Sequence, residues 1–222
     1  MNKTRNFVLI ILSVFAIAAC APRQANVAEL IAQIEAGEIP ADVTRATIDP
    51  ATSNIEWLGQ KITGDGHYGT INVKSGEFFV FDGNILGGNV IVDMTTIKVV
   101  DITDSVPAAG LRGHLESDDF FSVASFPEAQ IQMVRVEPIE GAAADAPNYK
   151  ITGNLTIKGI THGIVFDARL DHTEGTIAGF ADFSFDRAKF DVRFASGSFF
   201  ENLGDNLIND NINLKIRLAA SY

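Results

Sequence analysis

Apolar and polar residues alternate through most of this chain, and turn-forming pairs interrupt the alternation. This pattern limits the chain to a fold of antiparallel strands. The clearest alternating faces are residues 151–157, 164–170, 177–185 and 212–218 at every second position. Asp82-Gly83-Asn84 lies between two such runs and is a strong hairpin signal. The fold class is therefore all-β.

From about Thr47 onward, the runs predict about eight strands joined mostly by hairpin-length loops. One or two short helices accompany them, one of them over residues 107–115. A switch of parity within residues 126–137 predicts a β-bulge. Successive hairpins favour a closed antiparallel barrel, while a two-sheet sandwich with Greek-key crossings is the alternative.

The N-terminus has the pattern of an export signal. Lys3 and Arg5 precede the apolar run 7–19, which is short for a membrane span. Ile17-Ala18-Ala19-Cys20 resembles the lipobox of bacterial lipoproteins. We therefore expect residues 1–19 to be a lipoprotein signal peptide and Cys20 to be the lipid-attachment site, with an ordinary signal peptide as the alternative. Cys20 is the only cysteine, so an intramolecular disulfide is excluded.

Residues 20–46 are interpreted as the lipidated cysteine, a tether and a short helix. Asn26 is a suitable N-cap, and the apolar residues 27, 30, 31 and 34 follow helical spacing. Gly37 and Pro40 would end that helix. The remaining residues, 47–222, form the predicted barrel domain.

The net charge of −11 argues against nucleic acid and anionic membrane surfaces as electrostatic partners. The chain contains 16 Phe but only three Tyr and one Trp, which favours an interior with few polar groups.

The stretch from His114 to Phe121, closed by Phe126-Pro127, crowds charged and aromatic residues without strand or helix periodicity. We expect it to be an irregular connection that covers one end of the sheet. Its sequence resembles the most recognisable block of the YceI-like family. Gly153-Asn154-Leu155-Thr156-Ile157-Lys158-Gly159, Phe185-Asp186-Arg187-Ala188-Lys189-Phe190 and Leu203-Gly204-Asp205 resemble further motifs of that family, in the same order.

The resemblance implies a lipocalin-like barrel associated with polyisoprenoid lipids, in a bacterial envelope protein that faces the periplasm. Ala21 after Cys20 favours the outer membrane. The expected function is to bind or carry an apolar amphiphile, a polyisoprenoid lipid or an isoprenoid quinone, which would be its partner. The alternative is a non-enzymatic envelope stress or interaction protein whose barrel has a filled core.

Alternation places bulky aromatic residues on inward strand faces, where they either line a slot for an apolar chain or fill a solid core. These ligand-binding candidates are Phe79, Phe81, Phe166, Phe183 and Phe185, with Phe120 and Phe121 from the irregular connection. Donors for a phosphate or quinone head are Arg112, His114 and Arg187. Alternatively, Arg187 pairs with Asp186 or Asp118 and fixes its loop.

No catalytic or metal-binding motif is visible in the sequence. His67, His114, His162 and His172 lack metal-ligand spacing to one another, and no zinc or nucleophile-elbow motif occurs. The sequence therefore predicts a protein that is not an enzyme and needs no cofactor beyond a bound lipid. A hydrolase or isomerase acting on lipid-like substrates is a weaker alternative.

Overall fold

The computed structural model describes residues 26–222. The predicted signal peptide 1–19 and the lipid-attachment site Cys20 lie outside the described residues. The elements are β1 (Glu29–Ile31), β2 (Thr44–Ile48), β3 (Asn54–Gln60), β4 (Gly66–Phe81), β5 (Asn84–Val99), α1 (Ser105–Glu116), β6 (Glu128–Pro138), β7 (Tyr149–Ile157), β8 (Ile160–Thr173), β9 (Thr176–Asp186), the 3-10 helices η1 (Arg187–Phe190) and η2 (Gly204–Asn206), and β10 (Asn211–Ser221).

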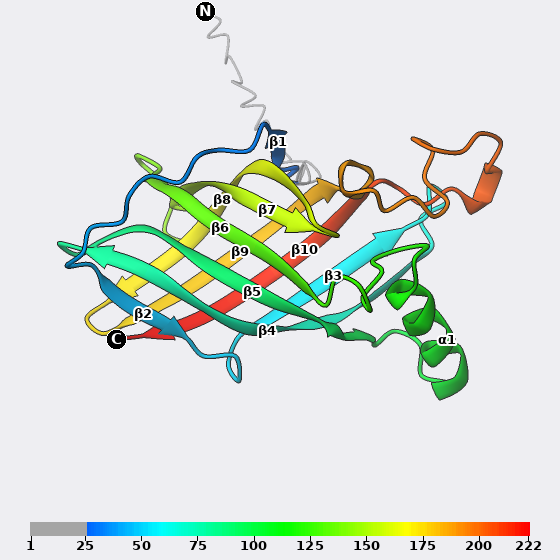
Figure 1. Ribbon diagram of the computed structural model, residues 1–222, viewed down its shortest axis with the longest axis horizontal. Coiled ribbons are helices and arrows are strands. Elements are labelled where there is room, and N and C mark those ends of the chain that lie inside the picture. The colour runs from blue at the N-terminus through cyan, green and yellow to red at the C-terminus, as the bar shows by residue number, and fades with distance from the viewer. Residues whose placement is uncertain (1–25) are drawn as a thin grey trace, which may run out of the picture.

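The eight strands β3 to β10 form a closed antiparallel barrel (Figure 1). Each strand pairs with the next one along the chain. The ring is closed by β10, whose residues 213–217 pair with residues 54–58 of β3. Closure satisfies the backbone groups that would otherwise lie at a sheet edge. The predicted lipocalin-like barrel is confirmed.

β2 and β3 together form one position in the barrel wall. β3 pairs with the first part of β4 and with residues 213–217 of β10, whereas β2 pairs with residues 77–80 of β4 and with Ala220 and Ser221. The turn between them is fixed by Asp49, which accepts hydrogen bonds from the Ala51 amide and the Thr52 hydroxyl. The wall therefore continues across this interruption.

The helix expected after Asn26 does not form, so that prediction was wrong. Residues 29–31 form β1, which pairs with residues 163–165 of β8 beyond the point where β8 and β9 separate. Backbone hydrogen bonds of 2.8 Å join Ser184 of β9 to Asn26 and Ala28. Local helical spacing is a weak signal, and the unpaired strand edges of β8 and β9 supply a stronger set of partners.

Two features of the barrel hold this N-terminal segment in place. The side chain of Asn154, which is almost fully buried, accepts from the Ile34 amide at 2.9 Å and donates to the Ile34 carbonyl at 2.8 Å. A Cβ atom at Gly163 would overlap the Ala32 carbonyl oxygen and lie 2.7 Å from Ile31 Cγ1. The glycine therefore permits the close approach of the segment to β8.

Several local predictions are confirmed. Asp82 and Gly83 have positive φ angles of 47° and 75° in the β4–β5 hairpin. β6 and β7 change register between Met133 and Arg135, as expected for a bulge. The predicted helix is α1, and its first turn is capped by the Asp104 carboxylate, which accepts from the Val106 amide at 3.1 Å.

The two ends of the barrel are built differently. The packed end is the one with the β4–β5 and β8–β9 turns, and Ile48, Val80, Ile85 and Ile177 fill it at 1–4% exposure. The capped end, at the right of Figure 1, is covered by α1, the connection 117–127 and the long segment 187–210. Packed aliphatic side chains therefore bound the interior at one end, and a helix with irregular segments bounds it at the other.

Candidate functional site

The barrel encloses a cavity of about 320 Å³ that reaches the capped end. Its wall is almost entirely apolar. From the strands it includes Ile55, Trp57, Ile71, Phe78, Val90, Val92, Met94, Met133, Ile151, Leu155, Phe166, Ala168, Leu170, Phe183, Phe185, Ile212, Leu214, Ile216 and Leu218. Leu111 and Leu115 of α1 complete it. The interior is therefore solid at the packed end and hollow beyond it.

Polar groups line the cavity mainly near the capped end. Gln60, Lys61, Asp65 and His67 belong to the end of β3, the following turn and the start of β4, and Arg187 follows β9. A ligand in this cavity would meet apolar surface along its length and polar side chains at one end. Such an arrangement suits an amphiphile.

Five of the predicted aromatic residues line the cavity. Phe166, Phe183 and Phe185 come from β8 and β9, and the rings of Phe166 and Phe183 stack with centroids 4.4 Å apart. Phe120 and Phe121 reach the cavity from the irregular connection. The connection thus contributes two aromatic side chains to the cavity at its capped end.

Phe79 and Phe81 do not line the cavity. Phe81 is 40% exposed, and Phe79 packs beneath the Arg45 guanidinium, whose carbon lies 5.0 Å from the ring centroid. The β4–β5 register shifts between Val73 and Ser75, so residues before and after the bulge have opposite parity. Phe78 therefore lines the cavity, and Phe79 and Phe81 do not.

Arg112 and His114 also lie off the cavity wall. Arg112 forms an ion pair with Glu116 one turn later in α1, with 3.5 Å between Nε and Oε1. His114 Nε2 lies 3.1 Å from Asp119 Oδ2, and its ring packs edge-on against Phe120 and Phe194. The imidazole therefore ties α1 to both covering segments, and α1 contributes Leu111 and Leu115 to the cavity instead.

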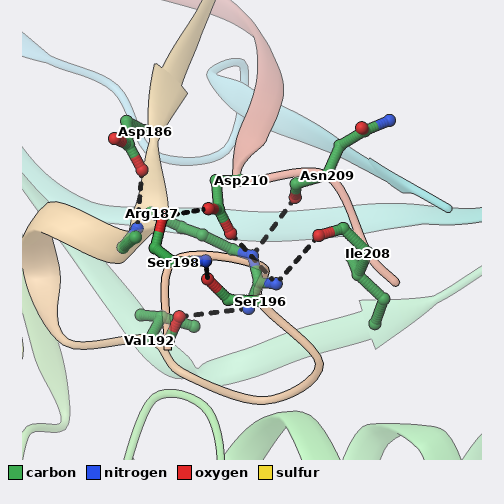
Figure 2. A network of polar contacts seen from close by, with 9 residues as sticks. Asp186, Arg187, Val192, Ser196, Ser198, Ile208, Asn209 and Asp210 are labelled. Atoms are coloured by element: carbon green, nitrogen blue, oxygen red, sulfur yellow. Dashed lines mark hydrogen bonds and ion pairs between the residues drawn. The ribbon is translucent and has the colours of Figure 1, made fainter. Parts of the chain in front are cut away.

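Arg187 lies at the centre of the capped end, and its side chain is 1% exposed (Figure 2). Its guanidinium donates to the carbonyls of Val192 at 3.1 Å, Ile208 at 3.3 Å and Asn209 at 3.3 Å. Asp210 Oδ1 lies 3.5 Å from Nη2 and forms the ion pair. Burial lowers the pKa of Arg187, and the nearby Asp210 and Asp186 carboxylates oppose that shift.

These contacts occupy most of the five N–H groups of the guanidinium. Asp186 does not pair with Arg187, because its carboxylate caps η1 by accepting from the Ala188 amide at 2.9 Å. Ser198 holds the second oxygen of Asp210 at 2.7 Å, as Figure 2 shows. The structure thus favours the interpretation of Arg187 as a residue that fixes its loop, but the carboxylate partner is Asp210 rather than Asp186 or Asp118.

Among the cavity-lining residues that were absent from the sequence candidates, Trp57 and His67 carry polar ring nitrogens. Trp57 of β3 is 8% exposed, and its Nε1 has no hydrogen-bond partner among the described residues. His67 of β4 places Nδ1 2.7 Å from Asp101 Oδ2. The signal available in the sequence was alternation, which puts Trp57 on the same face as Ile55.

Asp101 is held by two donors near the mouth of the cavity. Burial raises its pKa, but hydrogen bonds from the His67 ring and the Tyr68 amide outweigh burial and lower the pKa below 3.8. The Tyr68 amide lies 3.1 Å from Oδ1. The carboxylate is therefore ionised and fixes the orientation of the His67 ring.

Within residues 26–222, the structure has no cluster of three or more His, Cys, Asp or Glu side chains arranged to hold a metal ion. In the same part of the chain, no helix is long and apolar enough to cross a membrane.

Comparison with known proteins identifies relatives over most of the barrel. Residues 47–220 match the model of the YceI-like domain. Protein YceI of Salmonella arizonae is 31% identical over 136 residues, covering 54% of this chain and 68% of that protein. A UPF0312 protein of Pectobacterium atrosepticum is 32% identical over 97 residues, 43% of this chain and 47% of that protein. The chain thus spans about half the length of the Pectobacterium relative.

Two solved structures share the fold. BcnA of Burkholderia cenocepacia has a TM-score of 0.57 at 17% identity, covering 78% of this chain and 99% of that chain. A polyisoprenoid binding domain from Saccharophagus degradans, implicated in plant cell wall breakdown, has a TM-score of 0.55 at 12% identity, covering 81% of this chain and 99% of that chain.

Proposed function

The chain belongs to the YceI-like domain family, and we propose that its barrel binds the apolar part of an amphiphile, an isoprenoid lipid or quinone. The observation that carries this proposal is the apolar cavity of about 320 Å³ inside a closed barrel. The name of the Saccharophagus structure supports the class of ligand, because that domain is described as polyisoprenoid-binding. We propose a binding role, not catalysis.

The lining of the cavity supplies the affinity in this proposal. Burying apolar surface contributes about 25 cal/mol per Å², so a hydrocarbon chain needs few polar contacts to be retained. An open space with this lining argues against the alternative of a barrel filled throughout, because side chains close only the packed end.

The cavity volume restricts how a long ligand would lie. A volume of about 320 Å³ is at the lower end of the range for ligand pockets, roughly 300–1,000 Å³. A short apolar chain fits within it, whereas the rest of a long polyisoprenoid would extend past the capped end or widen the barrel. We therefore propose that the cavity holds one portion of such a chain.

We further propose that the barrel works in a bacterial envelope, held to a membrane by a lipid on Cys20 and facing the periplasm. The lipobox-like sequence supports this part of the proposal. Metabolic labelling with a palmitate analogue tests it. We expect label on the full-length chain and none on Cys20→Ala, and an unlabelled wild-type chain would contradict lipidation without affecting the proposed cavity ligand.

Native mass spectrometry of the full-length chain, extracted with a mild detergent, tests the binding function. We expect an apolar lipid to remain bound and to be released on unfolding. Calorimetric titration of the delipidated protein with squalene provides a second measurement. Absence of a co-purifying lipid together with absence of squalene binding would contradict the proposed function.

A further inference from the structure

The capped end carries large apolar side chains that are exposed to solvent. Figure 1 shows α1 and the segment 187–210 beyond the ends of the strands, where the cavity reaches the surface. Five large apolar side chains on α1, this segment and the β3–β4 turn are 39–77% exposed, and we call them the apolar rim: Ile62, Val106, Phe194, Phe199 and Phe200. Exposed apolar groups gathered on one surface mark a site of interaction with a protein or a lipid.

The apolar rim is continuous with the wall of the cavity. Phe120 lines the cavity, and its ring centroid lies 5.3 Å from that of Phe194 in the rim. The Ile62 amide donates to the Leu207 carbonyl at 3.1 Å, so the β3–β4 turn lies against the segment 187–210. An apolar chain that leaves the cavity at the capped end therefore meets further apolar side chains before it reaches water.

Two of the exposed phenylalanines belong to a turn that is fixed to the barrel. The amides of Phe199 and Phe200 both donate to the Ser196 carbonyl, at 3.1 and 3.0 Å. Ser196 is fully buried, whereas the two phenylalanines that follow it are 41% and 49% exposed. The turn therefore holds these two rings outside the core, where they have apolar surface left for a partner.

The N-terminal segment places the capped end close to the proposed lipid on Cys20. The Asn26 carbonyl accepts from the Ser184 amide at 2.8 Å, and Ser184 lies near the end of β9 that reaches the capped end. The chain from Cys20 to Asn26 spans at most about 20 Å when fully extended. Thr176, at the packed end of β9, lies about 26 Å from Ser184 along the strand. A bilayer that holds Cys20 is therefore within reach of the rim, and the packed end is the farther of the two ends.

The charges near the rim indicate which lipid surface it fits. Arg193 is 58% exposed, pairs with Asp191 and lies over the Phe199 ring, 5.2 Å from its centroid, so its guanidinium is placed to contact a lipid phosphate. The covering segments also carry exposed carboxylates, which an anionic surface would repel: Asp118, Asp119, Glu201 and Asp205. The rim therefore suits a zwitterionic surface.

We propose that the apolar rim docks on a zwitterionic bilayer and that an apolar chain passes between the bilayer and the cavity through the capped end. This proposal rests on the proposed binding function and adds the surface through which the ligand is exchanged. Phe199 and Phe200 enter the boundary between headgroups and acyl chains, where the apolar side chains of interfacial segments lie. The partner is the lipid surface itself, not a carrier protein.

Fluorescence quenching tests the contact with the bilayer. A bimane label is attached to Phe199→Cys in the rim or to Phe81→Cys at the packed end, two positions that are 41% and 40% exposed. The full-length chain is bound to phosphatidylcholine vesicles whose acyl chains carry bromine, and labelled wild type gives the background from Cys20. We expect the emission at position 199 to fall by about twofold or more, because interfacial side chains reach the acyl boundary. The emission at position 81 should not change.

Ligand transfer tests what docking does. Radiolabelled squalene is loaded into the full-length chain, and its passage into phosphatidylcholine vesicles is timed. For Phe199→Glu we expect the transfer rate to fall by roughly 3- to 10-fold, the factor for losing one partly buried apolar side chain from the contact. The dissociation constant of squalene should stay within about twofold of wild type, because Phe199 does not line the cavity. The matched control is Phe81→Glu, which should change neither quantity.

The outcomes separate the docking surface from the binding function. Equal quenching at positions 199 and 81, or an unchanged transfer rate in Phe199→Glu, would overturn the docking surface and leave lipid binding intact. Quenching that requires added phosphatidylglycerol would contradict the fit to zwitterionic lipid. Absence of squalene binding by wild type would overturn the proposed function, whereas quenching at position 199 is measured without squalene and tests docking by itself.

Discussion

The packed end and the capped end close the same barrel by different physical means. Ile48, Val80, Ile85 and Ile177 close the packed end, and their contacts are short-range and apolar. Irregular chain closes the capped end and depends on directed contacts, among them Arg187 and the bond from Lys158 Nζ to the Asp191 carbonyl at 2.7 Å. Close packing leaves no room for a guest, whereas a covering of loops leaves the hollow beneath it open.

Replacement of Arg187 should have the largest effect. Arg187→Met leaves Asp210 and three carbonyls without their buried donor, and breaking a buried ion pair costs about 3–5 kcal/mol. Urea unfolding measures the loss. The control is Arg169→Met, whose partner Asp171 is on the barrel exterior and whose loss should cost at most about 1 kcal/mol. Equal losses in the two variants would show that the capped end does not depend on Arg187.

Truncation of an isoleucine should reduce the free energy of unfolding more in the solid part of the interior than beside the cavity. Ile177→Ala removes atoms that are in contact on all sides, so we expect a loss near 4 kcal/mol. Ile71→Ala removes atoms that border the cavity and already lack some contacts, so we expect about 2 kcal/mol. Thermal and urea unfolding of both variants check this difference, and a larger loss for Ile71→Ala would contradict it.

Enlarging an alanine should have opposite consequences in the two regions. Ala46→Leu at the packed end overfills a fully buried site and should cost about 1–3 kcal/mol. Ala168→Leu places its added atoms in the cavity, so stability should change by less than about 1 kcal/mol while squalene binding weakens. Unfolding and titration of both variants test the pair. Unchanged squalene binding by Ala168→Leu would show that the probe binds elsewhere.

The smallest expected effect is a pH dependence at the mouth of the cavity. The pKa of Asp101 is lower in the folded protein than its ordinary value of 3.8. The ionised carboxylate therefore stabilises the fold at pH values above 3.8, and this stabilisation is lost as the pH falls through the lowered pKa. The stability difference between wild type and Asp101→Asn should therefore shrink as the pH falls below about 4. A difference that grows as the pH falls below about 4 would contradict this assignment.

The sequence predicted most of the barrel because each strand and turn carries a local signal. Alternation located the inward faces of β7 to β10, and Asp82-Gly83 marked its hairpin. Strand parity across β4 could not be predicted, because the bulge between Val73 and Ser75 reverses it and leaves no signal in the pattern. This is why Phe79 and Phe81 were proposed in place of Phe78.

The contacts of the candidate site were harder to predict because they join distant parts of the chain. Arg187 pairs with Asp210, not with its sequence neighbour Asp186, because the loop returns beside η1. β1 forms where β8 and β9 separate, and the separation is a property of the closed sheet.

Because Trp57 lies in the cavity wall, the intrinsic tryptophan fluorescence of the protein can report ligand binding. Trp57 is the only tryptophan, so excitation at the red edge of protein absorption selects one indole. A quinone in the cavity would quench this emission by contact, whereas a saturated chain would change its wavelength by displacing water. The intrinsic spectrum of the unlabelled protein therefore records whether the barrel is empty or occupied.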